Sequence, residues 1–290
     1  MNVRYIFSRD FYLRIVLSLT LWPTHAYSQI GGTIICAEIN GDTIIVSADS
    51  RASILAPNNE HMGYIDSFPK FFPFGNGIIG SAGNDFWKGR SIELIIKDFL
   101  TEQPNKTDFS DLVSKFRDYL DKNYPIPDTL QKYQQLLFAG YVKERALIFM
   151  LDRTPSIRSK DLETTYKGNM STERQQFIRY FNAHIHDQPL HTSLDVAAFY
   201  EKMIKAYALA INDTVRIGGP ISVALLIKPS PSAVKPNIYW IKNNLLNHSC
   251  GTEKQYIQKI ESGKIKIVPL FPYSKALILQ TIKNWTSSAL

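Results

Sequence analysis

Residues 32–51 read Gly32-Thr33-Ile34-Ile35-Cys36-Ala37-Glu38-Ile39-Asn40-Gly41-Asp42-Thr43-Ile44-Ile45-Val46-Ser47-Ala48-Asp49-Ser50-Arg51. The stretch holds two short apolar runs rich in β-branched residues, which favour extended strands. Asn40-Gly41 separates the two runs, and both residues tolerate a positive φ. The pattern therefore predicts a hairpin with its turn at Asn40-Gly41. A Gly-Thr pair opens its first strand, and Asp49 closes the second.

A second hairpin is predicted for residues 68–83, after a polar loop over residues 54–67. Its turn is Gly75-Asn76-Gly77, Lys70 opens its first strand, and Ala82-Gly83 follows its second strand at the mouth of a helix. Apolar residues at helical or strand spacing then predict the remaining elements. The expected helices span 84–101 (capped by Asn84 or Asp85), 108–122, 172–183 and 194–211. The expected strands span 135–141, 145–152 and 237–241, and residues 216–227 are expected to form a turn into a further strand.

The composition is that of a folded protein with a full hydrophobic core. The chain has 290 residues, 44% of them hydrophobic, and a formal net charge of +7. The charges are spread singly, which favours a solvated basic surface over a nucleic-acid site. Two cysteines are too few for a disulfide scaffold or a Cys-based zinc site. Cys36 either packs as a small core residue or pairs with Cys250, and both alternatives stay open.

Residues 1–28 have the pattern of a secretory signal peptide. Arg4, Arg9 and Arg14 form a basic start, and residues 15–22 form a short apolar run. Ala26-Tyr27-Ser28 offers small residues where a signal peptidase reads, so cleavage is expected between Ser28 and Gln29. The expected location is therefore the periplasm or the extracellular space. No stable membrane span is expected, because no segment reaches about 18 uninterrupted apolar residues.

The order of these features resembles that of proteasome β-type subunits and their bacterial relatives, the N-terminal-nucleophile hydrolases. In that family a Gly-Thr bond is cut, the freed Thr is the nucleophile, and an Asp follows sixteen residues later, as Asp49 follows Thr33 here. The resemblance continues through Lys70, through Ala82-Gly83 and through a Gly-Gly turn at Gly218-Gly219. It covers residues 33–242, leaving 29–32 as a short propeptide and 243–290 as a C-terminal docking extension.

The resemblance implies an α+β fold, a four-layer αββα sandwich of two stacked antiparallel sheets flanked by helix pairs. It also implies an exported N-terminal-threonine hydrolase that cleaves an amide bond, by family default in a peptide. Rings are common in the family, which implies a homo-oligomer. No cofactor, metal or nucleic acid is expected.

The implied chemistry places four residues in one site. Thr33 is the nucleophile, and its own α-amino group is the base, with a pKa already close to neutrality. Asp49 and Lys70 form a charge pair, in which the ammonium lowers the pKa of the amine and the carboxylate orients the ammonium. The backbone N–H of Gly83 faces the developing oxyanion.

Several alternatives stay open from the residues themselves. If Asn40-Gly41 is aligned with the family's turn, the register shifts by one residue and Gly32 takes the place of the nucleophile. Asp49 can simply end a strand by accepting backbone N–H groups, and Lys70 can be an ordinary surface residue on a strand edge. The fold can then serve as a binding or assembly protein without catalysis, and an unrelated secreted α/β protein is a third possibility.

Two further positions bear on these alternatives. The family usually has an Asp and a Ser before its Gly-Gly turn, where this chain has Thr214 and Ile217, and Asp213 lies one residue away. The family's Ser after its fourth strand is displaced or lost in 167–171. His184, His186 and His191 could bind metal by spacing, but no carboxylate stands at a ligand spacing on a regular element, so no metal site is predicted.

Overall fold

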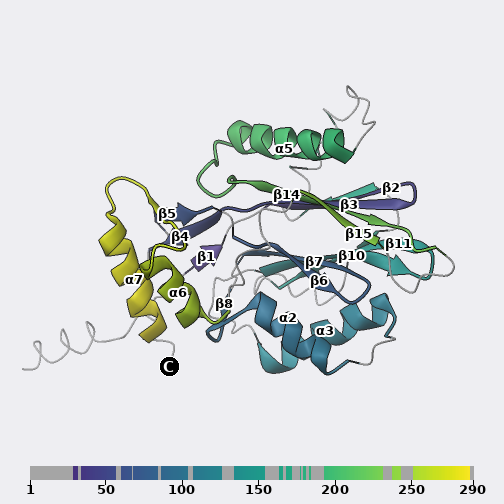
Figure 1. Ribbon diagram of the computed structural model, residues 1–290, viewed down its shortest axis with the longest axis horizontal. Helices are drawn as coiled ribbons and strands as arrows, with labels where there is room; N and C mark the ends of the chain where they lie inside the picture. The colour runs from purple at the N-terminus through teal and green to yellow at the C-terminus, as the bar shows by residue number, and fades with distance from the viewer. Residues whose placement is uncertain are drawn as a thin grey trace, which may run out of the picture.

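The protein is a mixed α+β structure with several antiparallel sheets (Figure 1). The computed structural model describes residues 29–31, 34–56, 60–66, 68–83, 86–103, 107–125, 134–153, 163–165, 168–171, 177, 179–180, 183, 193–230, 237–242 and 251–287. Residues 1–28, with the expected signal peptide, lie outside these ranges.

Two five-stranded sheets stack against each other. We call them the β3 sheet, with strand order β13-β2-β3-β14-β15, and the β7 sheet, with order β12-β11-β10-β7-β6. Every pairing within them is antiparallel. The strands span β2 Ile35–Asn40, β3 Thr43–Asp49, β6 Phe71–Phe74, β7 Gly77–Gly83, β10 Gln134–Val142, β11 Arg145–Asp152, β12 Glu163–Thr165, β13 Gly168–Ser171, β14 Ile221–Ile227 and β15 Asn237–Lys242.

Successive side chains along each strand face opposite sides of its sheet, so each sheet packs against a different layer on each face. In β3, Val46 and Ala48 face the β7 sheet, whereas Ile45 faces the opposite side, where it packs with Tyr200 and Met203 of α5. Helix α5 (Ser193–Ala210) therefore covers the outer face of the β3 sheet. Helices α2 (Ile92–Thr101) and α3 (Phe109–Asn123) cover the outer face of the β7 sheet (Figure 1).

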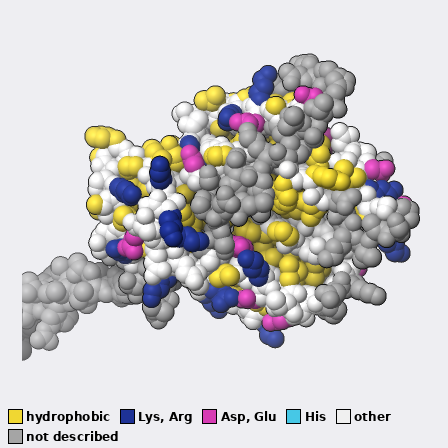
Figure 2. All heavy atoms as spheres, in the orientation of Figure 1, with side chains coloured by type: hydrophobic (Ala, Val, Ile, Leu, Met, Phe, Trp, Pro, Cys, Tyr) yellow, Lys and Arg dark blue, Asp and Glu magenta, His cyan; other side chains and the backbone are white. Residues whose placement is uncertain are grey.

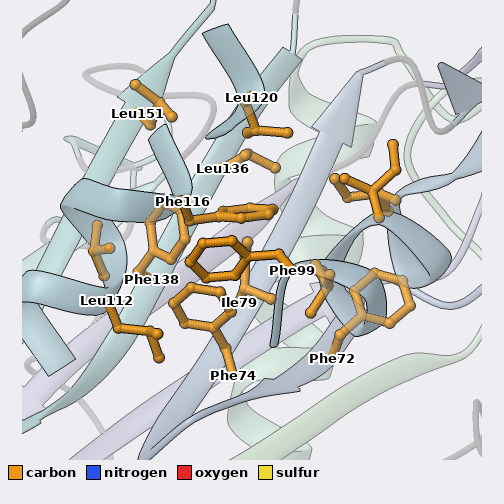
Figure 3. Close-up of a cluster of buried hydrophobic side chains, with 14 of the residues drawn as sticks. Phe72, Phe74, Ile79, Phe99, Leu112, Phe116, Leu120, Leu136, Phe138 and Leu151 are labelled. Atoms are coloured by element: carbon orange, nitrogen blue, oxygen red, sulfur yellow. The ribbon is translucent and has the colours of Figure 1, made fainter. Parts of the chain in front are cut away.

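The core under α2 and α3 is rich in phenylalanine. Phe74 of β6 packs against Phe99 of α2 and Phe116 of α3, with ring centroids 6.1 and 5.2 Å away (Figure 3). The phenyl ring of Phe138 on β10 lies 5.3 Å from Phe74 on the sheet side. Such clusters combine large buried apolar area with favourable ring geometry, which fixes both helices on the sheet.

A third sheet stands at one end of the sandwich and joins the C-terminal residues to the fold. Its order is β1-β4-β5-β16, and we call it the β4 sheet. Apolar side chains of α6 and α7, including Tyr256, Ile260 and Ile278, pack on Ile54 and Ile65 of this sheet. Its elements are β1 Gln29–Gly31, β4 Ala52–Leu55, β5 His61–Ile65, β16 Val268–Pro269, α6 Glu253–Glu261 and α7 Lys275–Ser287.

Three local predictions need correction. The first turn consists of Gly41 and Asp42, one residue later than expected, because Asn40 still pairs with Thr43 and Gly41 supplies the positive φ of 59°. Residues 54–67 hold most of a strand pair, where a loop was expected. The first helix begins at Ile92, where the Ser91 side chain accepts the Leu94 N–H, and residues 86–91 form a small hairpin of β8 (Phe86–Trp87) and β9 (Arg90–Ser91).

Most other expected elements are confirmed, among them the hairpin turn at Gly75-Asn76, helix α3, and strands β10, β11, β14 and β15. Most of the expected helix at 172–183 lies outside the described residues. No helix in the described ranges is long and apolar enough to cross a membrane.

Candidate functional site

Asp49 ties three backbone segments together at the end of β3. Its side chain is fully buried. One carboxylate oxygen accepts the N–H of Ile34 at 2.9 Å, and the other accepts the N–H groups of Gly218 at 2.9 Å and Arg51 at 3.3 Å. The expectation that Asp49 can accept backbone N–H groups is met. One side chain thereby fixes the entry to β2, the exit from β3 and the turn that leads into β14.

The hairpin register bears on the question of which residue stands beside this carboxylate. Ile35 pairs with Ala48, so Ile34 lies opposite Asp49 at the end of the hairpin. The N–H that Asp49 binds is the one in the Thr33–Ile34 peptide bond. Gly32 and Thr33 themselves lie outside the described residues. The shifted register relied on a turn at Asn40-Gly41, and the turn is at Gly41-Asp42.

Lys70 brings a positive charge to Asp49 from the other sheet. It is fully buried just before β6, with its ammonium nitrogen 4.8 Å from the ring centroid of Phe68. Burial raises the pKa of the Asp49 carboxyl to about 7, while the Gly218 N–H and then the charge of Lys70 act to lower it. The alternative that Lys70 is an exposed edge residue is wrong, because none of its side chain reaches solvent.

Gly83 lies at the same end of the β7 sheet as Lys70. The carbonyl of Lys70 accepts the N–H of Ser81 at 2.9 Å, two residues before Gly83. Gly83 is buried, pairs with Gln134 and has a φ of 101°, a conformation that L side chains rarely adopt. It ends β7 rather than opening a helix, because β8 and β9 intervene before α2.

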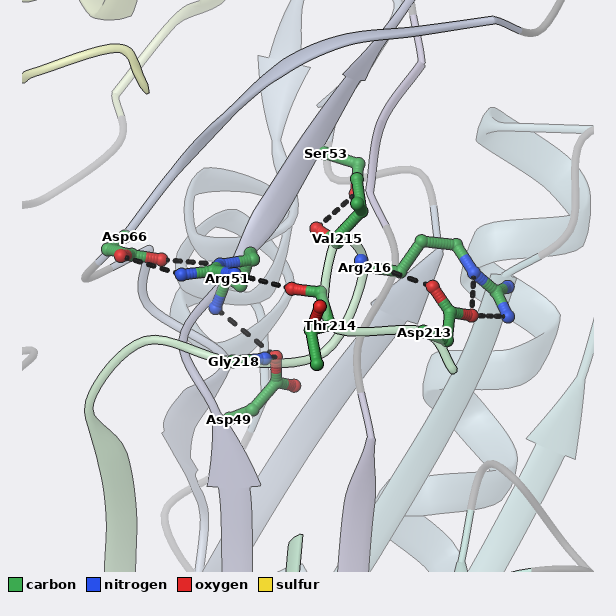
Figure 4. A network of polar contacts seen from close by, with 9 residues as sticks. All are labelled: Asp49, Arg51, Ser53, Asp66, Asp213, Thr214, Val215, Arg216 and Gly218. Atoms are coloured by element: carbon green, nitrogen blue, oxygen red, sulfur yellow. Dashed lines mark hydrogen bonds and ion pairs between the residues drawn. The ribbon is translucent and has the colours of Figure 1, made fainter. Parts of the chain in front are cut away.

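An ion pair that the sequence reasoning missed supports the Gly-Gly turn. The guanidinium of Arg51 donates to both oxygens of Asp66, at 2.8 and 3.0 Å, and lies 3.7 Å from the ring centroid of Tyr64 (Figure 4). A Cβ on Gly218 would lie 2.9 Å from this guanidinium. The turn before β14 therefore packs directly on the ion pair. The sequence did not single out Asp66, because a polar loop was predicted for its segment.

The residues before the Gly-Gly turn hold one another and lie near the β4 sheet. The Asp213 carboxylate pairs with the side chain of Arg216, so it is engaged within its own turn. The Thr214 carbonyl accepts from Arg51, and the Val215 carbonyl accepts from the Ser53 hydroxyl at 3.3 Å (Figure 4).

The segment that precedes Thr33 forms a strand at the edge of the β4 sheet. Ile30 pairs with Ile54, and Gly31 pairs with Ser53. The backbone immediately before the Gly32–Thr33 bond is therefore held antiparallel to β4.

The cysteines and the histidine cluster are the remaining candidates from the sequence. Cys36 is a buried free thiol whose pKa is raised, first by burial and then by the charge of Glu38, whereas Cys250 lies outside the described residues. His184, His186 and His191 also lie outside them. Across the described ranges, no group of three or more His, Cys, Asp or Glu side chains could hold a metal ion.

Comparison with known proteins does not supply a family. No family model matches the chain, and no curated protein matches it. A solved structure, Anbu from Hyphomicrobium sp. strain MC1, is similar over 80% of this chain and 93% of its own, with 11% sequence identity and a TM-score of 0.46. A similarity at that level carries no argument about the fold or the site.

These findings correct the assignment made from the sequence. Membership of the proteasome β-type and N-terminal-nucleophile hydrolase family was expected from the order of motifs. That assignment is wrong, because no family model matches and the structural similarity has only 11% identity and a TM-score of 0.46.

Proposed function

We propose that this protein is an amide hydrolase whose nucleophile is Thr33, freed as an amino-terminal residue by cleavage of the Gly32–Thr33 bond. The observation that carries the proposal is the binding of the Ile34 N–H by the buried Asp49 carboxylate, with the charge of Lys70 acting on the same carboxylate. This arrangement ties the peptide bond that follows Thr33 to two buried, opposite charges. Two buried charges are costly to maintain and are often found at functional sites.

The reaction follows from the chemistry of a free amino-terminal threonine. The Thr33 hydroxyl attacks the carbonyl carbon of an amide, and its proton passes to the Thr33 α-amino group. The C–N bond breaks, that proton goes to the departing amine, and an ester forms on Thr33. Water then hydrolyses the ester, again with the amine as base. Lys70 keeps the pKa of the amine low by like-charge repulsion, and the Gly83 N–H stabilises the oxyanion.

Three further expectations belong to the same proposal. The layers described above form a four-layer αββα sandwich, in which a helix within 172–183 is the partner of α5. The protein is exported after cleavage near Ser28-Gln29, which leaves residues 29–32 as a propeptide. The substrate is a peptide, and the protein works as a homo-oligomer.

The test compares the wild-type chain with Thr33→Ala, using an electrophile that acylates amino-terminal threonine and a set of fluorogenic peptide amides. Thr33→Ala is expected to lose labelling and to lower hydrolysis at least a thousandfold. Thr43→Ala, a threonine of the same hairpin outside the site, should keep both activities. Equal hydrolysis by Thr33→Ala and the wild type would refute the proposal.

The second candidate is a binding or assembly protein without catalysis. It is favoured by the three backbone N–H groups on Asp49, which give that carboxylate a sufficient structural role. The pairing of Gln29–Gly31 with β4 also suits a chain that keeps its amino-terminal segment. If this candidate is right, the electrophile does not label the wild type and the wild type does not hydrolyse the peptide amides, while Asp49→Ala still destabilises the fold.

A further inference from the structure

The segment after α6 exposes two lysines and an apolar side chain, and the residues between them are buried. Lys264, Lys266 and Val268 are exposed, whereas Ile265 and Ile267 between them are buried in the core under α6 and α7. Because Ile265 and Ile267 point into that core, the exposed side chains of Lys264, Lys266 and Val268 point away from it. This segment leads into β16, which pairs with β5 at the edge of the β4 sheet.

The chain after β16 adds a fully exposed aromatic side chain to the same surface. Phe271 is 99% exposed, more than any other large hydrophobic residue in the described ranges. Lys275 and Leu277, at the start of α7, are exposed as well, while Ile278 and Ile282 of this helix are buried. Figure 2 shows hydrophobic atoms gathered at the upper left edge, where Figure 1 draws the loop that leads into α7.

We propose that these residues bind the surface of a lipid bilayer that contains anionic lipids. The proposed contact, the 264–277 surface, consists of Lys264, Lys266, Val268, Phe271, Lys275 and Leu277. Lysines attract anionic headgroups, and an aromatic ring with neighbouring aliphatic side chains inserts among the upper acyl carbons. The chain would lie on the bilayer at this surface and would not span it.

The local charges favour this binding partner. Lys264, Lys266 and Lys275 are exposed, and within the described part of the chain they take part in no ion pair. Of the acidic groups beside them, Glu261 is paired with Lys283 at 2.5 Å, whereas Glu60 accepts a hydrogen bond from Tyr273 and keeps its negative charge. Three lysine charges against the carboxylate of Glu60 leave the surface net cationic, which complements an anionic leaflet.

Two other occupants fit less well. A second copy of this surface would bring the same three lysines together, and like charges oppose such a symmetric contact. A protein partner buries an apolar anchor most effectively in a pocket, with a surrounding rim that excludes water. Phe271 instead projects almost completely into solvent, which suits insertion into a soft headgroup layer.

The test is co-sedimentation of the full chain with vesicles of phosphatidylcholine alone or with 30% phosphatidylglycerol. The wild type is expected to bind the anionic vesicles and to be released as salt rises from 50 to 500 mM. Lys264→Gln/Lys266→Gln/Lys275→Gln should weaken binding by at least tenfold, since each lysine near the surface contributes about fivefold. Phe271→Ser should weaken it about tenfold.

Two control variants distinguish binding through the 264–277 surface from effects of the protein's total charge or of exposed apolar side chains in general. Lys115→Gln/Lys122→Gln/Lys202→Gln removes the same charge from exposed positions on α3 and α5. Leu209→Ser removes an apolar side chain that is 69% exposed on α5. Both controls should bind as the wild type does. Absence of wild-type binding, equal binding to neutral vesicles, or equal losses in the controls would each overturn the proposal.

Discussion

Burial of Asp49 and its polar contacts shift the pKa of its carboxyl in opposite directions. Its oxygens accept three backbone N–H groups and face Lys70, which favours the charged carboxylate. Its complete burial favours the neutral acid, and burial is the larger effect. The result is a carboxyl with a pKa near 7 in a position that fixes the ends of two strands.

This balance predicts how stability depends on pH. In the unfolded chain Asp49 ionises near pH 3.8, and in the folded protein near 7. Between these values the folded state holds a proton that the unfolded state has released. The wild type should therefore lose up to about 1.4 kcal/mol of unfolding free energy per pH unit relative to Asp49→Asn as pH rises from 4 to 7.

Urea unfolding of both proteins from pH 4 to 8 measures this difference. The stability that protonated Asp49 contributes is fully present below about pH 4 and gone above about pH 7, so the gap should shift in favour of the asparagine variant. A gap that is constant over this range would mean that the carboxylate stays charged in the folded protein.

The Gly218-Gly219 turn predicts a second effect at the residue scale. Gly219 has a φ of 72°, and a Cβ there would lie 2.8 Å from an Asp66 oxygen and 2.9 Å from the Ser50 hydroxyl. Gly219→Ala should destabilise the protein by about 2–4 kcal/mol, from backbone strain and overpacking together. Thermal or urea unfolding measures the change.

Gly89→Ala is the matched control for this substitution. Gly89 has nearly the same φ, 70°, but nothing lies within 4 Å of the added Cβ. It should cost only the strain, about 1–2 kcal/mol. Equal costs at both positions would show that the packing on Asp66 and Ser50 contributes nothing.

The sequence identified some of these residues and missed others for a physical reason. Asp49, Lys70 and Gly83 were singled out by the resemblance in motif order, and the clear apolar pattern of the strands beside them is what made that order visible. Arg51 and Asp66 were not paired in advance, because their contact depends on how the β4 sheet folds over the end of β3. A charged residue in an expected loop gives no local sign of its partner.

At the scale of elements, the C-terminal helices complete the core of the β4 sheet. Ile278 of α7 is fully buried in that core, whereas its neighbour Leu277 is 49% exposed. Ile278→Ala should destabilise the protein by about 2–5 kcal/mol, and Leu277→Ala by less than about 0.5 kcal/mol. Chemical denaturation of the two variants gives both values.

The outcome tells whether residues 252–287 are integral to the fold. If Ile278→Ala unfolds with the stability of the wild type, α7 is only loosely attached. The expectation of a docking extension at 243–290 would then suit a detachable arm better than the packed unit described above.

Elements whose turn and cap residues lie within their own sequence were predictable. Elements that depend on packing partners distant in the sequence were not. The hairpin of β6 and β7 and the helix α3 have their turn and cap residues in sequence, at Gly75-Asn76 and Asp108. Strands β4 and β5 were taken for a loop because their apolar partners lie about two hundred residues later. Helix α2 was started too early, because Ser91 rather than Asn84 or Asp85 is its cap.

At the scale of the whole molecule, the order of the expected hairpins and helices, and the resemblance that rested on this order, predicted the mixed α+β class and the antiparallel sheets. The stacked sheets bring Asp49 from the β3 sheet close enough to Lys70 from the β7 sheet for their charges to interact. The order of motifs suggested a family as well, but order alone was insufficient, since no family model matches the chain. The proposed chemistry therefore depends on one bond, Gly32–Thr33.

The amino terminus of the purified protein tests this bond directly. Intact mass and amino-terminal sequencing of the wild type should give a chain that begins at Thr33, while Thr33→Ala should retain the preceding residues. On the proposed chemistry the Thr33 hydroxyl itself cuts the Gly32–Thr33 bond, so the alanine variant, which lacks this hydroxyl, cannot be processed. A stable wild-type chain that begins at Gln29, with no acylation by a threonine-directed electrophile, would contradict the account.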